Sequence, residues 1–196
     1  GIYGASKAGK TTLHRQLMTR GEVPDIQKRT VGRHRATRKF VKLDGDAHTV
    51  RTADIGGQTV YWEEWVRDMR GRHVKYIVFL FDDRHLDKHY DIEQQLSWTF
   101  LVDTICNPYW TIGGRKKKKQ EHDYPLAVGL WANKYDLWKD KYPHTGKMED
   151  HPIFASFKPG LQKLNETGIP CHKYIVSAKS DSEMVYRGIL TMIKDY

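Results

Sequence analysis

The chain has 196 residues, of which 39% are hydrophobic and 29% are charged, and its net charge at pH 7 is +9. This length and composition fit one soluble globular domain over residues 1–196, and no apolar run approaches the ~20 residues that a membrane-spanning helix needs. Cys106 and Cys171 stand in no metal-binding or redox spacing, which indicates a reducing compartment. We therefore expect a cytoplasmic protein, and peripheral attachment to a membrane stays open.

A glycine-rich loop lies close to the start of the chain. Residues 1–3 look like the end of a strand, which predicts that the domain begins upstream, and Leu13 and Leu17 have helical spacing after the loop. When it lies between a strand and a helix, the pattern GxxxxGK[ST] forms a phosphate-binding loop. Its backbone N–H groups and its lysine bind the phosphates, and its Ser or Thr hydroxyl binds Mg²⁺. An ordinary glycine turn is the alternative. The residues expected to hold the polyphosphate are Gly4, Ala5, Ser6, Lys7, Ala8, Gly9, Lys10, Thr11 and Thr12.

The next stretch is strongly basic. Seven Lys or Arg residues and no acid lie from Lys28 to Lys42. Residues 38–43 and 49–53 predict two strands joined by a hairpin turn at Asp44-Gly45. The charge suggests an acidic protein, an anionic membrane or nucleic acid as a partner, and the sequence does not choose among them.

A second motif, Asp54-Ile55-Gly56-Gly57-Gln58, follows the second of these strands. A carboxylate at Asp54 can hold Mg²⁺ through water, and Gly57 lets a backbone N–H approach the terminal phosphate. The amide of Gln58 can orient an attacking water without titrating. Taken alone the motif is typical of a strand-ending turn, and its place downstream of the glycine-rich loop favours the nucleotide role.

Strand and helix patterns then alternate. Trp62, Trp65 and Val66 fall on one helical face, and residues 76–81 predict a buried strand. Residues 91–105 predict a helix. The side chains expected to share its buried side are Ile92, Leu96, Phe100 and Leu101.

Residues 107–124 look like a basic insertion loop between a helix and a strand. They contain Arg115-Lys116-Lys117-Lys118-Lys119, a charge run of the kind that is usually solvated. The histidines, including His34, His48 and His73, show no metal-binding spacing and are expected to be surface or core residues. We expect Trp98, Trp110 and Trp138 to serve packing.

Two polar motifs follow apolar strand-like runs in the last third. After residues 126–132 come Asn133-Lys134-Tyr135-Asp136, and after residues 174–176 come Ser177-Ala178-Lys179. The Asp136 carboxylate can accept from both N1–H and the exocyclic amine of guanine, a donor pair that adenine lacks. Polar turns after strands are the alternative for each motif. The base-binding residues are thus expected to be Asn133, Lys134, Asp136, Ser177, Ala178 and Lys179.

The remaining elements complete an α/β pattern. Residues 151–164 predict a helix interrupted at Pro159-Gly160, and residues 182–194 predict the closing helix. This alternation favours a mostly parallel sheet with helices on both faces and one antiparallel edge hairpin, with the ligand loops at the carboxyl ends of the strands.

With these four motifs, the chain resembles the Ras-like small GTPases, and within them the Arf type. The doubled glycine before Gln58, Trp65 seven residues later, and Thr30-Val31-Gly32 carry the Arf likeness. The resemblance implies a three-layer P-loop fold with a six-stranded sheet, GTP or GDP with Mg²⁺ as ligands, and slow hydrolysis. It also implies that Thr30 covers Mg²⁺ beside Thr11 and Asp54, and that Lys10, Thr30 and Gln58 are the catalytic residues.

Some positions depart from the Arf pattern. Arg33 and Ala53 stand where Arf-type proteins carry effector-binding aromatics, so the usual Arf partner is not expected. Ser6 and Lys7 replace more frequent loop residues without forbidding nucleotide binding. Arg29, beside Thr30, could act in cis on the γ-phosphate, although most switch arginines face partners or solvent.

Three functional hypotheses remain from the sequence. The leading one is a GTP-hydrolysing molecular switch that binds effectors and regulators through two switch segments. The second is a GTP-binding interaction module that does not hydrolyse the nucleotide. The third is a nucleic-acid-associated GTPase that uses its basic face, with strongly salt-dependent binding.

Overall fold

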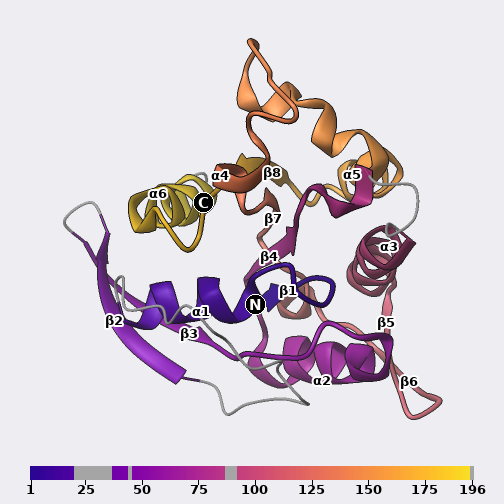
Figure 1. Cartoon of the computed structure of the whole chain (residues 1–196). Coiled ribbons are helices and arrows are strands. Elements are labelled where there is room, and N and C mark those ends of the chain that lie inside the picture. The colour runs from indigo at the N-terminus through magenta and orange to yellow at the C-terminus, as the bar shows by residue number, and fades with distance from the viewer. Residues whose placement is uncertain (20–36, 44–45, 87–91, 195–196) are drawn as a thin grey trace.

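A parallel sheet forms the centre of the molecule in the computed structural model, which describes residues 1–19, 37–43, 46–86 and 92–194 (Figure 1). The sheet has four strands in the order β1-β4-β7-β8, and all three neighbouring pairs are parallel. Its strands are β1 (Ile2–Tyr3), β4 (Tyr76–Phe81), β7 (Ala127–Ala132) and β8 (Cys171–Ile175). The expected buried strand at residues 76–81 is confirmed.

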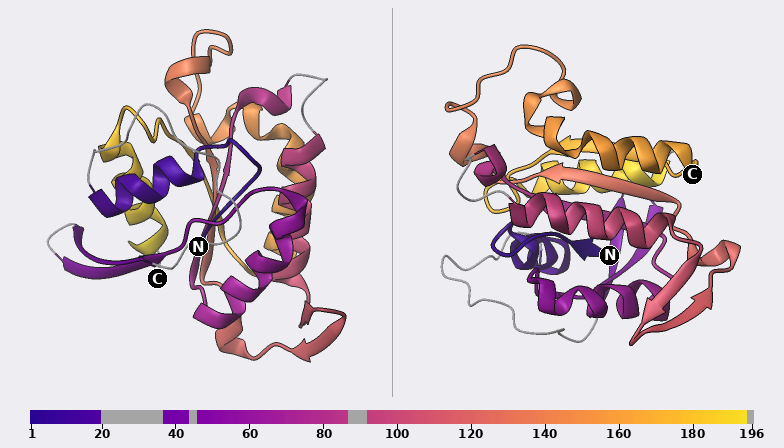
Figure 2. Two further views of the ribbon diagram at one scale, coloured as in Figure 1. Left: turned by 60° about the horizontal axis from the view of Figure 1, so that its bottom comes forward. Right: turned by 90° about the vertical axis from the view of Figure 1, so that its right-hand side faces the viewer.

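Helices cover both faces of this sheet (Figure 2). Successive strand side chains point to opposite faces, so Phe79 and Leu130 join one core while Leu80 and Trp131 join the other. The second core lies under α1 (Lys10–Thr19) and α6 (Ser182–Lys194). The helices on the first face are α2 (Trp62–Arg72), α3 (Ile92–Cys106) and α5 (Lys158–Glu166). The α/β layering expected from the sequence is therefore present.

The antiparallel hairpin differs from the expectation. Strands β2 (Thr37–Leu43) and β3 (Asp46–Thr52) pair from Thr37↔Thr52 to Leu43↔Asp46, but they form a separate two-stranded sheet. Among the described residues the sheet therefore has four strands instead of the expected six. Strand β1 has two residues and pairs with β4, so it offers β3 very few backbone groups for a second ladder.

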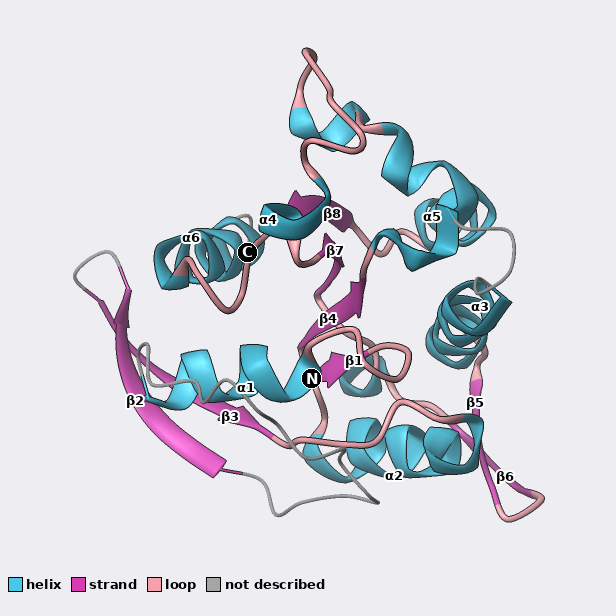
Figure 3. Cartoon of the chain, in the orientation of Figure 1, coloured by secondary structure: helices cyan, strands magenta, loops and turns pink. Residues whose placement is uncertain are grey.

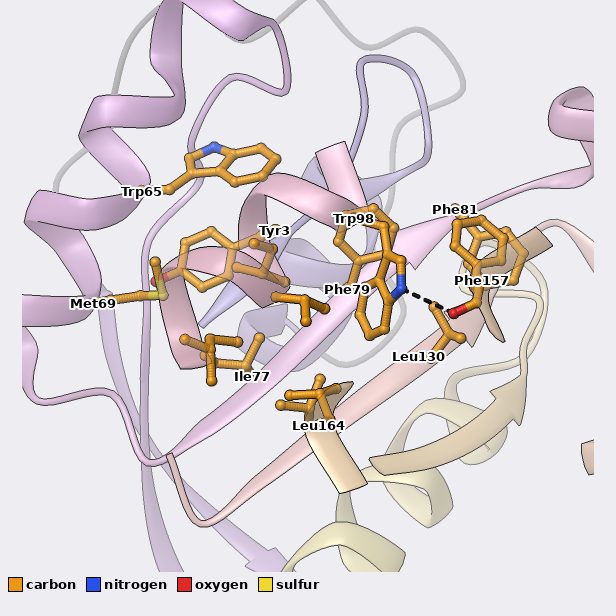
Figure 4. Close-up of a cluster of buried hydrophobic side chains, with 14 of the residues drawn as sticks. Tyr3, Trp65, Met69, Ile77, Phe79, Phe81, Trp98, Leu130, Phe157 and Leu164 are labelled. Atoms are coloured by element: carbon orange, nitrogen blue, oxygen red, sulfur yellow. Dashed lines mark hydrogen bonds between the residues drawn. The ribbon is translucent and has the colours of Figure 1, made fainter. Parts of the chain in front are cut away.

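Helix α3 lies where a helix was predicted. Leu101 is buried and Phe100 packs against the core, as expected, but the buried face is rotated away from the rest of the predicted side. Ile92 and Leu96, expected inside, are 74% and 51% exposed. Trp98 is buried instead, because its indole N–H donates to Phe157 O at 3.2 Å and its ring packs against Phe79 (Figure 4). The bulky indole and its hydrogen-bond partner therefore set the rotation of the helix about its axis. The spacing of apolar residues along the sequence could not predict this rotation, because the partner lies in another element.

The segment expected as one helix over residues 151–164 is divided. A 3₁₀ stretch, η5 (Pro152–Phe157), runs directly into α5, so the change of helix type precedes Pro159-Gly160. Pro159 stands in the first turn of α5, where its missing N–H costs little. A Cβ at Gly160 would lie 2.1 Å from Trp98 Nε1, so glycine allows α5 to approach α3 closely.

The region expected as a basic loop contains a second hairpin. Strands β5 (Tyr109–Ile112) and β6 (Arg115–Lys118) pair antiparallel beside α2. Arg115 to Lys118 are exposed, as expected for a solvated run, but Lys119 is buried. Its ammonium lies 4.1 Å from the centre of the Trp110 ring and donates to Ile105 O at 2.8 Å and to Thr104 O, at the end of α3. Lys119 thus caps the negative end of the α3 dipole.

Short elements complete the description. They are α4 (Tyr135–Trp138), η1 (Thr59–Tyr61), η2 (Asp83–Leu86), η3 (Glu121–Asp123) and η4 (Met148–Asp150). Trp98, Trp110 and Trp138 are buried, in keeping with their expected packing role. Over the ranges that the structure describes, none of the helices has the length and apolar content that crossing a bilayer requires.

Candidate functional site: four loops at the carboxyl ends of the strands

The predicted motifs follow the carboxyl ends of strands. The glycine-rich loop joins β1 to α1, Asp54 comes two residues after β3, and Asn133 and Ser177 follow β7 and β8 (Figure 3). Strands β1, β7 and β8 belong to the parallel sheet, whose carboxyl ends share one edge, so the loops that follow them become neighbours. Gly57 brings the loop after β3 to the same edge. The contacts between the loops show how closely they meet.

Two glycines in the first loop are required by the backbone. Gly4 has φ +140°, and a Cβ there would lie 2.0 Å from Leu80 O on the neighbouring strand β4. Gly9 has φ +97°, and its Cβ would lie 2.2 Å from the side-chain nitrogen of Asn133. The loop can therefore pass this close to β4 and Asn133 only with glycine at both positions.

Lys10 begins α1 with a buried ammonium. It donates to Ala5 O at 2.7 Å, and burial lowers the pKa of Lys10 to about 8 although Asp54 and Glu93 act in the opposite direction. Removing a lysine from water disfavours its charged form. An anion bound beside Lys10 would favour the charged form of the lysine again, so the site fits a phosphate group.

Thr11 and Asp54 meet across the loop junction. The Thr11 hydroxyl lies 2.9 Å from Asp54 Oδ2 and 3.1 Å from Oδ1. A hydroxyl and a carboxylate are hard oxygen ligands of the type that Mg²⁺ prefers. Two residues expected to bind the metal, Thr11 and Asp54, therefore lie together. Thr30, expected to complete the set, and Arg29 fall outside the described residues.

Gly57 brings the second motif against the first. A Cβ at this position would lie 2.4 Å from Lys10 Nζ and 2.5 Å from both Ala5 C and Gly4 O, so only glycine fits. Gln58 follows directly and its carbonyl accepts from Tyr61 N–H at 2.9 Å at the start of η1. Gln58 is therefore the residue next in sequence to Gly57, which contacts the phosphate loop.

Asn133 connects three loops with one side chain. Its amide nitrogen donates to Ala8 O at 3.0 Å, and its amide oxygen accepts from Ala178 N–H at 3.0 Å. The residue is buried, and its own N–H donates to Phe81 O at the end of β4. The phosphate loop and the base-side loop are consequently held in one arrangement.

The other base-side residues are positioned by backbone and side-chain contacts. Lys134 adopts a left-handed conformation with φ +63°, and its ammonium donates to Lys7 O at 2.8 Å. Ser177 Oγ accepts from Asp136 N–H at 2.9 Å, which leaves the Asp136 carboxylate at the exposed rim. Lys179 contributes its carbonyl, which accepts from Gln16 Nε2 at 3.4 Å.

A buried carboxylate that the sequence analysis missed ties the site together. Asp82 is fully buried, and it accepts from Lys134 Nζ at 2.6 Å, Arg84 Nε at 2.7 Å and Gln94 Nε2 at 2.8 Å. Burial raises the pKa of Asp82, but Lys134 and Arg84 outweigh this and hold it below its usual value. An acid directly after the buried strand at residues 76–81 was the available sequence signal.

Glu93 is a second missed residue, and it lies at the phosphate loop itself. Its Oε1 accepts from Ser6 N–H at 3.2 Å, while Arg84 Nη2 donates to Ser6 O at 2.8 Å. A carboxylate bonded to a loop N–H opposes the binding of phosphate there, since both are anions. The loop thus carries one feature that works against a highly charged ligand.

Comparison with known proteins supplies no further constraint. No protein-family model matches the sequence, and a search of curated proteins found no match either.

Proposed function

We propose that the protein is a GTP-binding and GTP-hydrolysing molecular switch of the Ras-like type, with Arf-like motifs. The observation that carries the proposal is the bridge made by Asn133, whose side chain joins Ala8 in the phosphate loop to Ala178 in the base-side loop. A site of this kind has one wall for the polyphosphate and one for the base. The Asp136 carboxylate at the rim supplies the acceptor that favours guanine.

The residues have separate roles in this proposal. Lys10 and the loop N–H groups neutralise and orient the phosphates, and Thr11 and Asp54 hold Mg²⁺, which neutralises developing negative charge when bound. Gln58 orients the attacking water, with Thr30 from the first switch segment. Effectors and regulators would bind the switch segments, and the basic stretch from Lys28 to Lys42 would attract an acidic partner.

The base assignment has a direct test. In Asp136→Asn the carboxylate becomes an amide, so affinity is expected to shift from GDP toward xanthosine diphosphate, whose altered purine edge matches the new donor. Asp140→Asn, a nearby exposed change, is the matched control and should leave the preference unchanged. Equal GDP binding by native protein and the Asp136 variant would contradict the assignment.

Hydrolysis requires its own experiment, because binding alone also fits a non-hydrolysing module. Protein loaded with GTP is followed through a single turnover, and Gln58→Leu is expected to slow the step at least tenfold while GTP affinity stays within about twofold. Native protein that retains intact GTP as long as the variant does would favour the interaction module.

A further inference from the structure

Two histidines and an aspartate converge at the other end of the sheet. His73 ends α2 just before β4, and His122 and Asp123 lie in η3 just before β7. His73 Nδ1 lies 3.1 Å from Asp123 Oδ1, and His122 Nε2 lies 3.8 Å from the same oxygen. One ligand atom from each of the three residues lies within 4.8 Å of the others. The 48 residues between the histidines hide this cluster from any spacing rule.

We infer that His73, His122 and Asp123 form a binding site for a divalent transition-metal ion of the zinc class. Imidazole nitrogen and carboxylate oxygen bind zinc at about 2.0–2.2 Å, so ligand atoms around one ion lie about 3–4 Å apart. Two of the contacts already have that separation. Small rotations of exposed imidazoles are enough to bring the third pair into range.

The surroundings hold the ligands in place. Asp123 Oδ2 accepts from Gln120 N–H at 3.0 Å, which leaves Oδ1 directed at the histidines. Lys75 Nζ donates to His122 O at 2.7 Å and fixes the backbone of that residue. Supporting contacts of this kind orient metal ligands and raise affinity.

His73 has a backbone that aims its side chain toward η3. It stands in the left-handed region with φ 46° and ψ 57°, and its ring centre lies 5.0 Å from that of His122. Glycine is the usual residue at such a helix end. Glycine at position 73 would therefore satisfy the backbone and remove only the ligand, which makes His73→Gly an informative variant.

The site is accessible and has an open coordination position. The side chains of His73 and His122 are 53% and 61% exposed, so an ion can reach them from solvent. Three protein ligands leave one position of a tetrahedral ion for water or an anion. The adjoining cavity of about 490 Å³ is also lined by Arg67, Arg70 and Lys117. These cations weaken the binding of a metal ion and attract an anion as the fourth ligand.

Zinc titration of the whole chain, with excess Mg²⁺ present, tests the inference. Native protein is expected to bind one Zn²⁺ with a Kd below about 10 µM. His122→Ala and His73→Gly should each weaken binding at least tenfold, whereas His144→Ala, on the loop between α4 and η4, should not. Unfolding by urea checks that the two variants remain folded.

Cobalt provides an independent readout on the unaltered protein. Co²⁺ is expected to give the intense visible absorption of a four-coordinate site, and Zn²⁺ should displace it. Zinc binding that survives His122→Ala but is lost in Thr11→Ala would place the ion at the phosphate loop and overturn the inference. Absence of zinc binding in the native chain would also overturn it.

Discussion

The two ends of the central sheet are built on different principles. At the carboxyl ends, the loops are joined by buried hydrogen bonds through Asn133 and Asp82, and glycines allow backbone contact. At the amino ends, the exposed imidazoles of His73 and His122 meet the buried carboxylate of Asp123. The first end is organised before any ligand arrives, and the second depends on an ion to complete it. The first end is therefore marked by sequence motifs, whereas the second arises only when the fold brings distant residues together.

The largest expected effect is a difference in the free energy of unfolding between variants at the two ends of the sheet. Asp82→Ala leaves Lys134, Arg84 and Gln94 without their shared acceptor, and we expect unfolding in urea to become easier by about 3–5 kcal/mol. Asp123→Ala also removes a buried acceptor, but its histidine partners are exposed and can turn to water, so the loss should be smaller, about 1–2 kcal/mol. Equal losses in the two variants would contradict the distinction between a prebuilt and an open site.

The next effect is a pH dependence of the ligand-free protein that comes from Lys10. The pKa of Lys10 is about 8 in the folded chain and 10.5 in the unfolded chain. Below pH 8 the lysine is charged in both states, so the cost of burying its charge lowers the free energy of unfolding by its full amount. Between pH 8 and 10.5 the folded chain binds fewer protons, so stability should rise by up to about 3 kcal/mol.

Comparing urea unfolding of native protein and Lys10→Met isolates this term. The pKa of Cys171, which burial raises to about 12, acts in the opposite direction above pH 9 in both proteins and cancels in the difference. The difference between the two curves should shrink as the pH rises, and saturating GDP should remove the part of the native rise that Lys10 contributes. The rise from Lys119, whose pKa burial also lowers to about 8, is present in both proteins. A constant difference would show that Lys10 is not a desolvated cation.

A smaller loss is expected at the end of α3. Lys119→Met removes the donor to Thr104 O and Ile105 O and the contact with Trp110, at a cost of about 1–2 kcal/mol at pH 7. Lys118→Met, on the exposed strand, is the matched control and should change stability by less than about 0.5 kcal/mol. Thermal unfolding of the two variants measures the contrast.

A substitution at Glu93 is expected to raise the affinity for nucleotide. Glu93→Gln removes a negative charge from the phosphate loop, so affinity for GTP should rise about tenfold, and that for GDP should rise less because GDP carries less charge. Fluorescence titration with both nucleotides measures the two ratios. Weaker GTP binding by the variant would indicate that Glu93 supports the loop more than it repels the ligand.

The smallest expected effect is that of Leu96→Gln, which tests the rotation of α3. Leu96→Gln alters an exposed side chain and should change the free energy of unfolding by less than about 0.5 kcal/mol, whereas Leu101→Ala creates a cavity in the core and should cost about 2–5 kcal/mol. A large decrease in the free energy of unfolding for Leu96→Gln would indicate that Leu96 is buried, as the sequence predicted.

The sequence predicted what depends on local backbone rules. Gly4, Gly9 and Gly57 stand in motifs whose spacing already requires close backbone approach, and the structure places them so. The role of Asp82 could not be predicted in this way, because it arises from Lys134 and Gln94, which come from two other elements. The buried face of α3 was predicted correctly at Leu101 and wrongly at Ile92 and Leu96, because Trp98 finds its acceptor at Phe157.

The contact between Lys134 and Lys7 has a consequence for how fast a ligand could come and go. Because the ammonium is already anchored to Asp82 and to the phosphate loop, little ordering remains to be done when a nucleotide enters. When the nucleotide leaves, these contacts remain, so the site stays ordered for the next nucleotide.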